Sequence, residues 1–220
     1  MTFVADIDIK LARDFMKRHH YLGDVPSSST YVMGLTNSRG CVTAVAAYGP
    51  CQAARLPRSY LELKRLAADN PEPSLSSFLA KTLAVLKKRN VRAVLTWADP
   101  AAGHHGGIYQ ATNWVYAEPR SYSWNCRFIT PSGDVVDHKK AFRLFGTSGK
   151  KRVLALNPTW RAELPPMKLR YLMPLNASQD VCIDELNAVQ KPYPKPVLGL
   201  PGRPPQSQRK PRLTCCGWRG

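Results

Sequence analysis

The chain has 220 residues, of which 44% are hydrophobic, so it is long enough to bury one substantial core with residues left for an appendage. Its formal charge of +17 and pI of about 9.9 favour a polyanionic partner, a nucleic acid rather than a membrane. No stretch approaches the roughly 18 apolar residues of a spanning helix, and the first residues lack the layout of a signal peptide, so we expect a cytoplasmic protein. The six cysteines show no CxxC or finger-like spacing, which argues against a zinc fold and a disulfide framework.

The first third of the chain reads as one helix followed by three strands. Apolar residues recur at helical spacing over residues 7–19, which predicts an amphipathic helix. Residues 30–37 and 41–49 predict two strands around a turn that contains asparagine and glycine, and residues 60–68 predict a third strand.

The third of these strands alternates in hydrophobicity. A strand with a two-residue period has one face in the core and one that is partly polar. We expect its two faces to be formed by Leu61, Leu63 and Ala67 on one side and by Glu62, Lys64 and Leu66 on the other.

The remaining elements continue the α/β alternation. Residues 74–89 predict a helix with serine at its start and cations at its end, and residues 91–100 predict a buried strand. A short helix follows a glycine-rich turn within residues 106–116. Further along, residues 138–145 predict a helix and residues 168–175 a late strand.

The composition changes near residue 190. The last segment is rich in proline, glycine and basic residues, contains no acidic residue and has no apolar periodicity, which is typical of a disordered tail. We therefore predict one domain over residues 1–189 and a basic, proline-rich tail over residues 190–220. The tail either adds salt-sensitive phosphate contacts or is a solvated segment without a specific role.

Two short stretches carry groups suited to chemistry. Ser74, Ser76 and Ser77 stand at the start of a helix, where backbone amides favour an anion, although ordinary N-capping explains such serines equally well. After the next strand, a carboxylate, two histidines and a tyrosine follow one another around a glycine loop: Asp99, His104, His105 and Tyr109.

The segment around this glycine loop carries a resemblance to a known family. The run from Asp99 to Trp114 is similar to the signature segment of the phage Mom family of DNA adenine modification proteins, which belongs to the GCN5-related acetyltransferase-like superfamily. Other segments resemble the family in the same order, over roughly residues 5 to 175: residues 19–23, 62–66, 132–156 and 168–171.

The resemblance implies a fold and an activity. The fold is α/β, an acetyltransferase-like (GNAT-like) mixed sheet flanked by helices and splayed around an acyl-CoA cleft. The activity is transfer of an acetamido (methylcarbamoyl) type group to the exocyclic amine of adenine in DNA, which protects phage DNA from host restriction. The partner would be DNA, the donor acetyl-CoA, and the location the cytoplasm of the host cell.

The resemblance also assigns cofactor residues. Ser76 and its neighbouring backbone amides would hold the pyrophosphate, and the other cofactor-binding residues would be Ser77, Leu66, Ala67 and Asn113. The chain departs from ordinary acetyltransferases in that it lacks their glycine-rich loop before this helix.

An adenine amine is a poor nucleophile, so the site must supply a base, an electrophile or a metal. The catalytic candidates are Tyr109, Asp99, His20, Tyr21 and Glu62. An open facial site of the iron type would be formed by His20, His104 and Asp99. The bland alternatives are that Asp99 caps a turn, that His104 bonds to backbone, that Tyr109 and Trp114 are core, and that Glu62 pairs with Lys64 or Arg65.

The basic residues also have two alternative interpretations: they contact DNA, or they form a solvated face. The DNA-binding candidates are Lys139, Lys140, Lys150, Arg152 and Arg170. Because the enzyme must either extrude the adenine from a duplex or use single-stranded DNA, we expect an aromatic slot, for which Trp97, Tyr122 and Trp124 are available unless they are core. The rival functions are an acetyl-CoA N-acetyltransferase acting on an RNA or protein amine and a non-catalytic DNA-binding protein.

Overall fold

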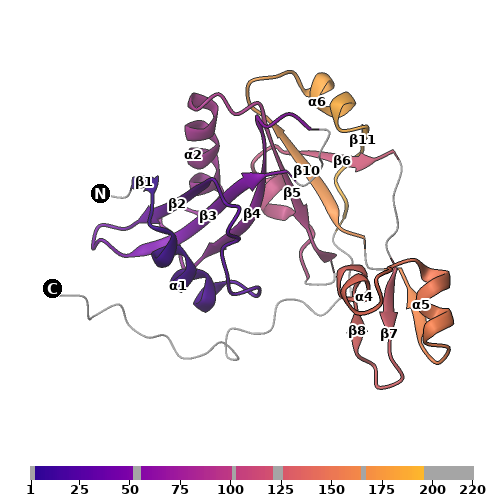
Figure 1. Ribbon diagram of the computed structural model, residues 1–220. Helices are drawn as coiled ribbons and strands as arrows, with labels where there is room; N and C mark the ends of the chain where they lie inside the picture. The colour runs from indigo at the N-terminus through magenta and orange to yellow at the C-terminus, as the bar shows by residue number, and fades with distance from the viewer. Residues whose placement is uncertain (1–2, 52–55, 101–102, 121–125, 165–166, 196–220) are drawn as a thin grey trace. The chain divides into compact units, whose positions relative to one another are not determined.

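The computed structural model describes residues 3–51, 56–100, 103–120, 126–164 and 167–195. The chain forms two compact units, which we call the main unit (residues 1–119 and 168–220) and the inserted unit (residues 120–167) (Figure 1). The region that we predicted as one domain thus divides into two compact units, and the inserted unit has a small core of its own.

The main unit is built on an eight-stranded sheet with the order β1-β2-β3-β4-β5-β10-β6-β11. Neighbouring strands are antiparallel except β4 and β5, which are parallel. The predicted mixed sheet is therefore confirmed. The strands are β1 (Phe3–Asp6), β2 (Tyr31–Thr36), β3 (Val42–Pro50), β4 (Tyr60–Ala68), β5 (Ala93–Ala98), β6 (Val115–Pro119), β10 (Leu169–Pro174) and β11 (Ala188–Gln190).

Helices cover both faces of this sheet, as predicted. On one face α2 (Leu75–Lys88) buries Phe78 and Leu79 in the largest core cluster, and α3 (Gly107–Gln110) packs beside it. On the other face α1 (Ile9–His19) packs against β2–β4, and α6 (Gln179–Glu185) packs at the opposite end, near β10 and β11 (Figure 1).

One bulge changes the face pattern of β4. Arg65 pairs with Ala47 of β3 and Leu63 pairs with Tyr48, so Lys64 is an extra residue in the ladder. An extra residue shifts the two-residue period by one. Leu66 therefore packs in the same core cluster as Leu61 and Leu63, whereas Ala67 packs against α1 on the other face, and our prediction for these two residues was wrong.

The sheet opens between its two parallel strands. β4 and β5 pair only over Tyr60–Glu62 and Ala93–Leu95; beyond these residues β4 pairs with β3 and β5 pairs with β10. We call this divergence the β4–β5 opening. At its closed end Thr96 Oγ1 donates to the carbonyl of Leu63 at 3.1 Å. The main sheet is thus splayed at its centre, as the family resemblance implies.

The inserted unit pairs three short strands with two helices, one of which we predicted over the same residues. Its core consists of Phe128, Val136, Ala141 and Val153. Its elements are β7 (Arg127–Ile129), β8 (Val135–Val136), α4 (His138–Phe145), α5 (Lys150–Leu156) and β9 (Arg161–Glu163), with β7 between β8 and β9.

The fold continues past residue 189, where we placed the start of the tail. β11 runs to Gln190, the amide of Lys191 donates to Tyr116, and the Tyr193 hydroxyl donates to the carbonyl of Trp114 at 2.8 Å. The rest of the predicted tail, residues 196–220, lies outside the described residues. Among the helices that are described, none combines the length and apolarity needed to cross a bilayer.

Candidate active site

A glycine holds the turn that precedes α3. Gly106 has a φ of +82°, and a Cβ there would lie 2.3–2.4 Å from the ring of Tyr171. The Tyr171 hydroxyl donates to the carbonyl of His105 at 2.8 Å, and Gln110 Nε2 donates to that hydroxyl at 3.1 Å. The β10 strand thus fixes the start of α3, and with it the position of Tyr109.

Tyr109 lies beside the β4–β5 opening. Its hydroxyl is 3.3 Å from Oγ1 of Thr96, and its ring contacts Trp114 and Tyr171, each with a centroid distance of 5.3 Å. Burial raises the pKa of Tyr109, against the effect of the Thr96 hydrogen bond. The phenol therefore keeps its proton at neutral pH and is available as a hydrogen-bond or proton donor.

His20 and Tyr21 come together with His104, although they are far apart in sequence. The rings of His20 and Tyr21 stack with centroids 4.7 Å apart, and the ring of Tyr21 is 5.9 Å from that of His104. Burial, and then the charges of Arg65 and His104, lower the pKa of His20 to about 4. His20 is therefore neutral at physiological pH.

The hydrogen bonds of His20 define what its ring can do. Its Nδ1 accepts from the amide of Leu22 at 3.1 Å, so in the neutral ring the proton is on Nε2. With this tautomer and a low pKa, His20 suits hydrogen-bond donation better than proton removal.

The low pKa of His20 predicts a pH effect on stability. Between about pH 6.5 and about pH 4 the unfolded chain binds a proton at this residue and the folded chain does not, so stability falls as the pH falls through this window. His20→Asn keeps an acceptor near the Leu22 amide and removes the titration. It should recover about 1 kcal/mol at about pH 4.5 relative to pH 7, after allowance for partial exposure. Urea unfolding of both proteins at the two pH values measures this; an unchanged pH dependence in the variant would contradict it.

Glu62 carries a carboxylate at the last paired position before the opening. Burial raises its pKa, and Lys64, Arg65 and Lys168 oppose the rise. The predicted ion pair with Lys64 or Arg65 is not formed within the described part of the chain. Instead Lys64 Nζ donates to Ser28 at 2.8 Å, and Arg65 donates to the carbonyls of Asp24 and Lys64.

Asp99 does not assemble a metal site with the histidines. Its carboxylate is 3.5 Å from Lys168 Nζ. Its carbonyl accepts from the His104 amide at 3.0 Å, which agrees with the alternative that Asp99 caps a turn. No three histidine, cysteine or acidic side chains of the described residues are grouped so that they could hold one ion. The predicted iron site of His20, His104 and Asp99 is therefore not formed.

The predicted cofactor residues lie at the start of α2, on the distal half of β4 and after α3. Ser74 caps α2 by accepting from the Ser77 amide at 3.3 Å, and its Oγ lies 3.0 Å from that of Ser76, so ordinary capping is confirmed. Leu66 and Ala67 lie on β4 beyond its last pair with β5. Asn113 is exposed, with a φ of +59°, where the chain leaves α3.

An exposed aromatic residue lies on the face of the sheet opposite α2. Trp97 of β5 is 41% exposed, so it is not core, and by strand alternation it shares this face with Arg170 of β10 and Glu62. The guanidinium carbon of Arg170 is 5.7 Å from the centroid of the Trp97 ring, and its Nε donates to the carbonyl of Ala117 at 2.8 Å. Arg170 is 8% exposed, a position that suits holding Trp97 rather than gripping a phosphate. Tyr122 and Trp124 lie outside the described residues.

The other predicted DNA-binding residues belong to the inserted unit. Lys139 and Lys140 are on α4, and Lys150 and Arg152 are on α5; all four are exposed. They form a group distinct from the residues around the β4–β5 opening.

Sequence reasoning missed Thr96, which bonds across the opening. A threonine amid the apolar residues of a buried strand was the available signal for it. Arg65 was considered only as a partner of Glu62, and Tyr171 only as part of the segment 168–171 that resembles the family. Their effects on the pKa of His20 and on the α3 turn could not be predicted, because these contacts join segments far apart in sequence.

Residues 1–195 match the model of the Mom protein family. No curated protein sequence matches the chain. Among solved structures, it is similar to the ribosomal-protein-S18-alanine N-acetyltransferase from Escherichia coli, with 11% identity, a TM-score of 0.46 and coverage of 82% of this chain and 97% of that one. For an N-acetyltransferase from Staphylococcus aureus Mu50 the identity is 10%, the TM-score 0.46 and the coverage 80% and 99%. For a GNAT family acetyltransferase from Brucella melitensis in complex with acetyl-CoA the identity is 12% and the TM-score 0.41, with coverage of 52% of this chain and 82% of that one. Because the family model spans most of its length, the chain belongs to the Mom protein family.

Proposed function

We propose that the protein converts the exocyclic amine of adenine in DNA to an acetamido-type group, with an acyl-CoA as the source of the added carbon unit. The observation that carries this proposal is the β4–β5 opening, which has a protonated phenol, Tyr109, on the α2 face and a carboxylate with a raised pKa, Glu62, at its closed end. A proton donor and a proton acceptor next to one opening are what transfer to an amine requires.

The residues around the opening fit an acyl-CoA. The first-turn amides of α2 have no acceptor within the helix. Ser74 accepts from the amide of Ser77, and the remaining first-turn amides suit a pyrophosphate. Past Glu62 the edge of β4 that faces β5 has no strand partner among the described residues, and it suits the amide groups of a pantetheine arm. When bound, the donor would supply an acyl group as an activated thioester, whose thiolate is the leaving group.

The chain's own residues then have separate tasks. Glu62 accepts the proton of the adenine amine, for which a raised pKa makes it a better base. Tyr109 donates a proton or hydrogen bond beside the leaving group. His20 presents its Nε2 proton as a donor at the approach to the site.

Trp97 suits the adenine ring itself. An adenine that reacts at its amine has to leave the base stack, and a pocket compensates by stacking it on an aromatic face. Trp97 is exposed, is held by Arg170 and shares the sheet face of Glu62, so a base stacked there has its amine near the carboxylate.

The test is mass analysis of deoxynucleosides from cells that express the protein. We expect a heavier deoxyadenosine with the natural chain, and a loss of about a hundredfold or more with Glu62→Gln, because the amide keeps the shape and removes the base. Asp14→Asn, which neutralises an exposed acid of α1, is the matched control and should leave the product unchanged.

Unmodified DNA in cells that contain the folded natural chain would contradict the proposal. In that case acetylated RNA or protein in the same cells would identify an ordinary N-acetyltransferase. DNA binding without any acyl transfer would identify a binding protein.

A further inference from the structure

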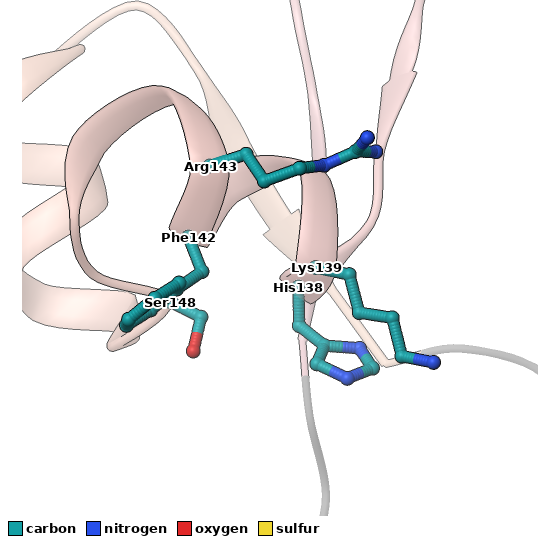
Figure 2. A pocket seen from close by; sticks show the side chains of 5 residues that line it. All are labelled: His138, Lys139, Phe142, Arg143 and Ser148. Carbon is teal, nitrogen blue, oxygen red and sulfur yellow. The ribbon is translucent and has the colours of Figure 1, made fainter.

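We propose that the inserted unit holds one nucleotide of the DNA strand in a hollow on α4, with the base against Phe142 and the phosphate against Lys139 and Arg143. The hollow has a volume of about 610 Å³ and is lined by His138, Lys139, Phe142, Arg143 and Ser148 (Figure 2). The inference rests on the proposed function only for the choice of DNA as the nucleic acid.

The shape of the hollow follows from helical spacing. His138 and Phe142 are four residues apart on α4 and lie on one stripe, while Lys139 and Arg143 are four residues apart on the next. Figure 2 shows an aromatic side of the hollow, with the Phe142 ring next to Ser148, and the extended Lys139 and Arg143 side chains on the other side. An aromatic surface next to two cations has the arrangement needed for one base and one phosphate.

Packing within the inserted unit does not explain the position of Phe142. Ala141 is the only residue of α4 that is buried, and Phe142 is 59% exposed. The core of the unit already includes Phe128 and Val153 and does not need another ring. Gly146, with a φ of +65°, ends α4 and turns the chain so that Ser148 reaches the hollow beside the Phe142 ring.

The charge of the inserted unit selects a polyanion. Residues 120–167 contain nine lysine and arginine residues and three acidic ones, a formal charge of +6. The three acidic side chains already have partners within the unit. Asp137 caps α4, Glu163 binds Arg127 and Arg161, and Asp134 accepts from Ser132. Within the described residues no carboxylate lies within 4.0 Å of the six cations on the two helices, Lys139, Lys140, Arg143, Lys150, Lys151 and Arg152.

These features favour a nucleic acid over a protein partner. The centre of a protein–protein interface is typically depleted of charged residues, whereas Lys139 and Arg143 both line this hollow. Stacking on a single ring tolerates any base, and cations contact the backbone of any sequence. The inserted unit therefore grips DNA without reading its sequence.

The experiment measures binding of the full chain to a single-stranded oligonucleotide that contains 2-aminopurine, a fluorescent analogue of adenine. Phe142→Ala should weaken binding about tenfold and reduce the fluorescence change, and Phe142→Trp should preserve both. Leu144→Ala is the matched control, because Leu144 is 56% exposed on the same helix and does not line the hollow. Replacing both Lys139 and Arg143 with glutamine should make the plot of log affinity against log salt concentration shallower, by about 1.4 in slope.

Two outcomes would overturn the inference. The first is a Phe142→Ala protein that binds with the natural affinity and the natural fluorescence change. The second is a Leu144→Ala protein that loses as much, which would point to an apolar contact surface for another protein. If DNA binding depends on Phe142 but the DNA stays unmodified, the site is supported and the proposed function is contradicted. If the DNA is modified but its binding does not depend on Phe142, the proposed function is supported and this site is contradicted.

Discussion

Tyr109→Phe is expected to lower adenine modification by about a hundredfold or more while the protein remains folded. The change removes only a hydroxyl, whose hydrogen-bond partner in the structure is Thr96, and Thr96 also bonds to the carbonyl of Leu63. The ring contacts with Trp114 and Tyr171 are kept, so the core should be little changed. Nucleoside mass analysis at matched protein levels measures the loss.

Tyr116→Phe is the control for this change. Tyr116 belongs to the same aromatic cluster, with its ring centroid 5.6 Å from that of Tyr171, and burial raises its pKa as well. It lies on β6, which β10 separates from β5, so its hydroxyl is away from the opening. Full activity in Tyr109→Phe, or an equal loss in both variants, would remove Tyr109 from the mechanism.

Gly106→Ala is expected to destabilise the main unit by about 2–5 kcal/mol. The backbone there is left-handed, which disfavours alanine by about 1–2 kcal/mol, and the added carbon would collide with the Tyr171 ring, a cost of about 1–3 kcal/mol more. Tyr171 is fully buried between neighbouring strands and cannot move aside. Chemical unfolding followed by circular dichroism measures the change.

Gly40→Ala separates the two contributions to that loss. Gly40 has a similar φ of +76°, but a Cβ there would meet no atom within 4 Å. It should cost only the backbone preference, about 1–2 kcal/mol. If the two variants were equally stable, the collision with Tyr171 would be relieved by local movement, and the α3 turn would be less rigid than we infer.

The sequence predicted the long elements of the fold well and the short ones poorly. α2 and the six-residue strand β5 were found because their apolar periodicity extends over several residues. The edge strands β1 and β11 have four and three residues, too few to show a period, and their pairing comes from neighbours. The bulge at Lys64 was also invisible, because a bulge depends on the partner strand rather than on the local sequence.

The sequence named residues that lie near the opening, but not their arrangement. Tyr109 and Glu62 lie next to the opening, and Tyr21 lies between His20 and His104 through ring contacts with both. The metal prediction failed because residue types and order do not tell how three side chains converge. A low pKa for His20 could not be foreseen either, since it arises from burial and from the charges of Arg65 and His104.

The place of β10 in the sheet determines the order in which a growing chain can complete its fold. β10 fills the centre, between β5 and β6, yet it is made only after both of them and after the whole inserted unit. Until the ribosome releases it, β5 and β6 each expose an unpaired edge with the apolar side chains of the core. The nascent protein is therefore most vulnerable to aggregation late in its synthesis, and the inserted unit, which has its own small core, can form while the main sheet is still missing its central strand.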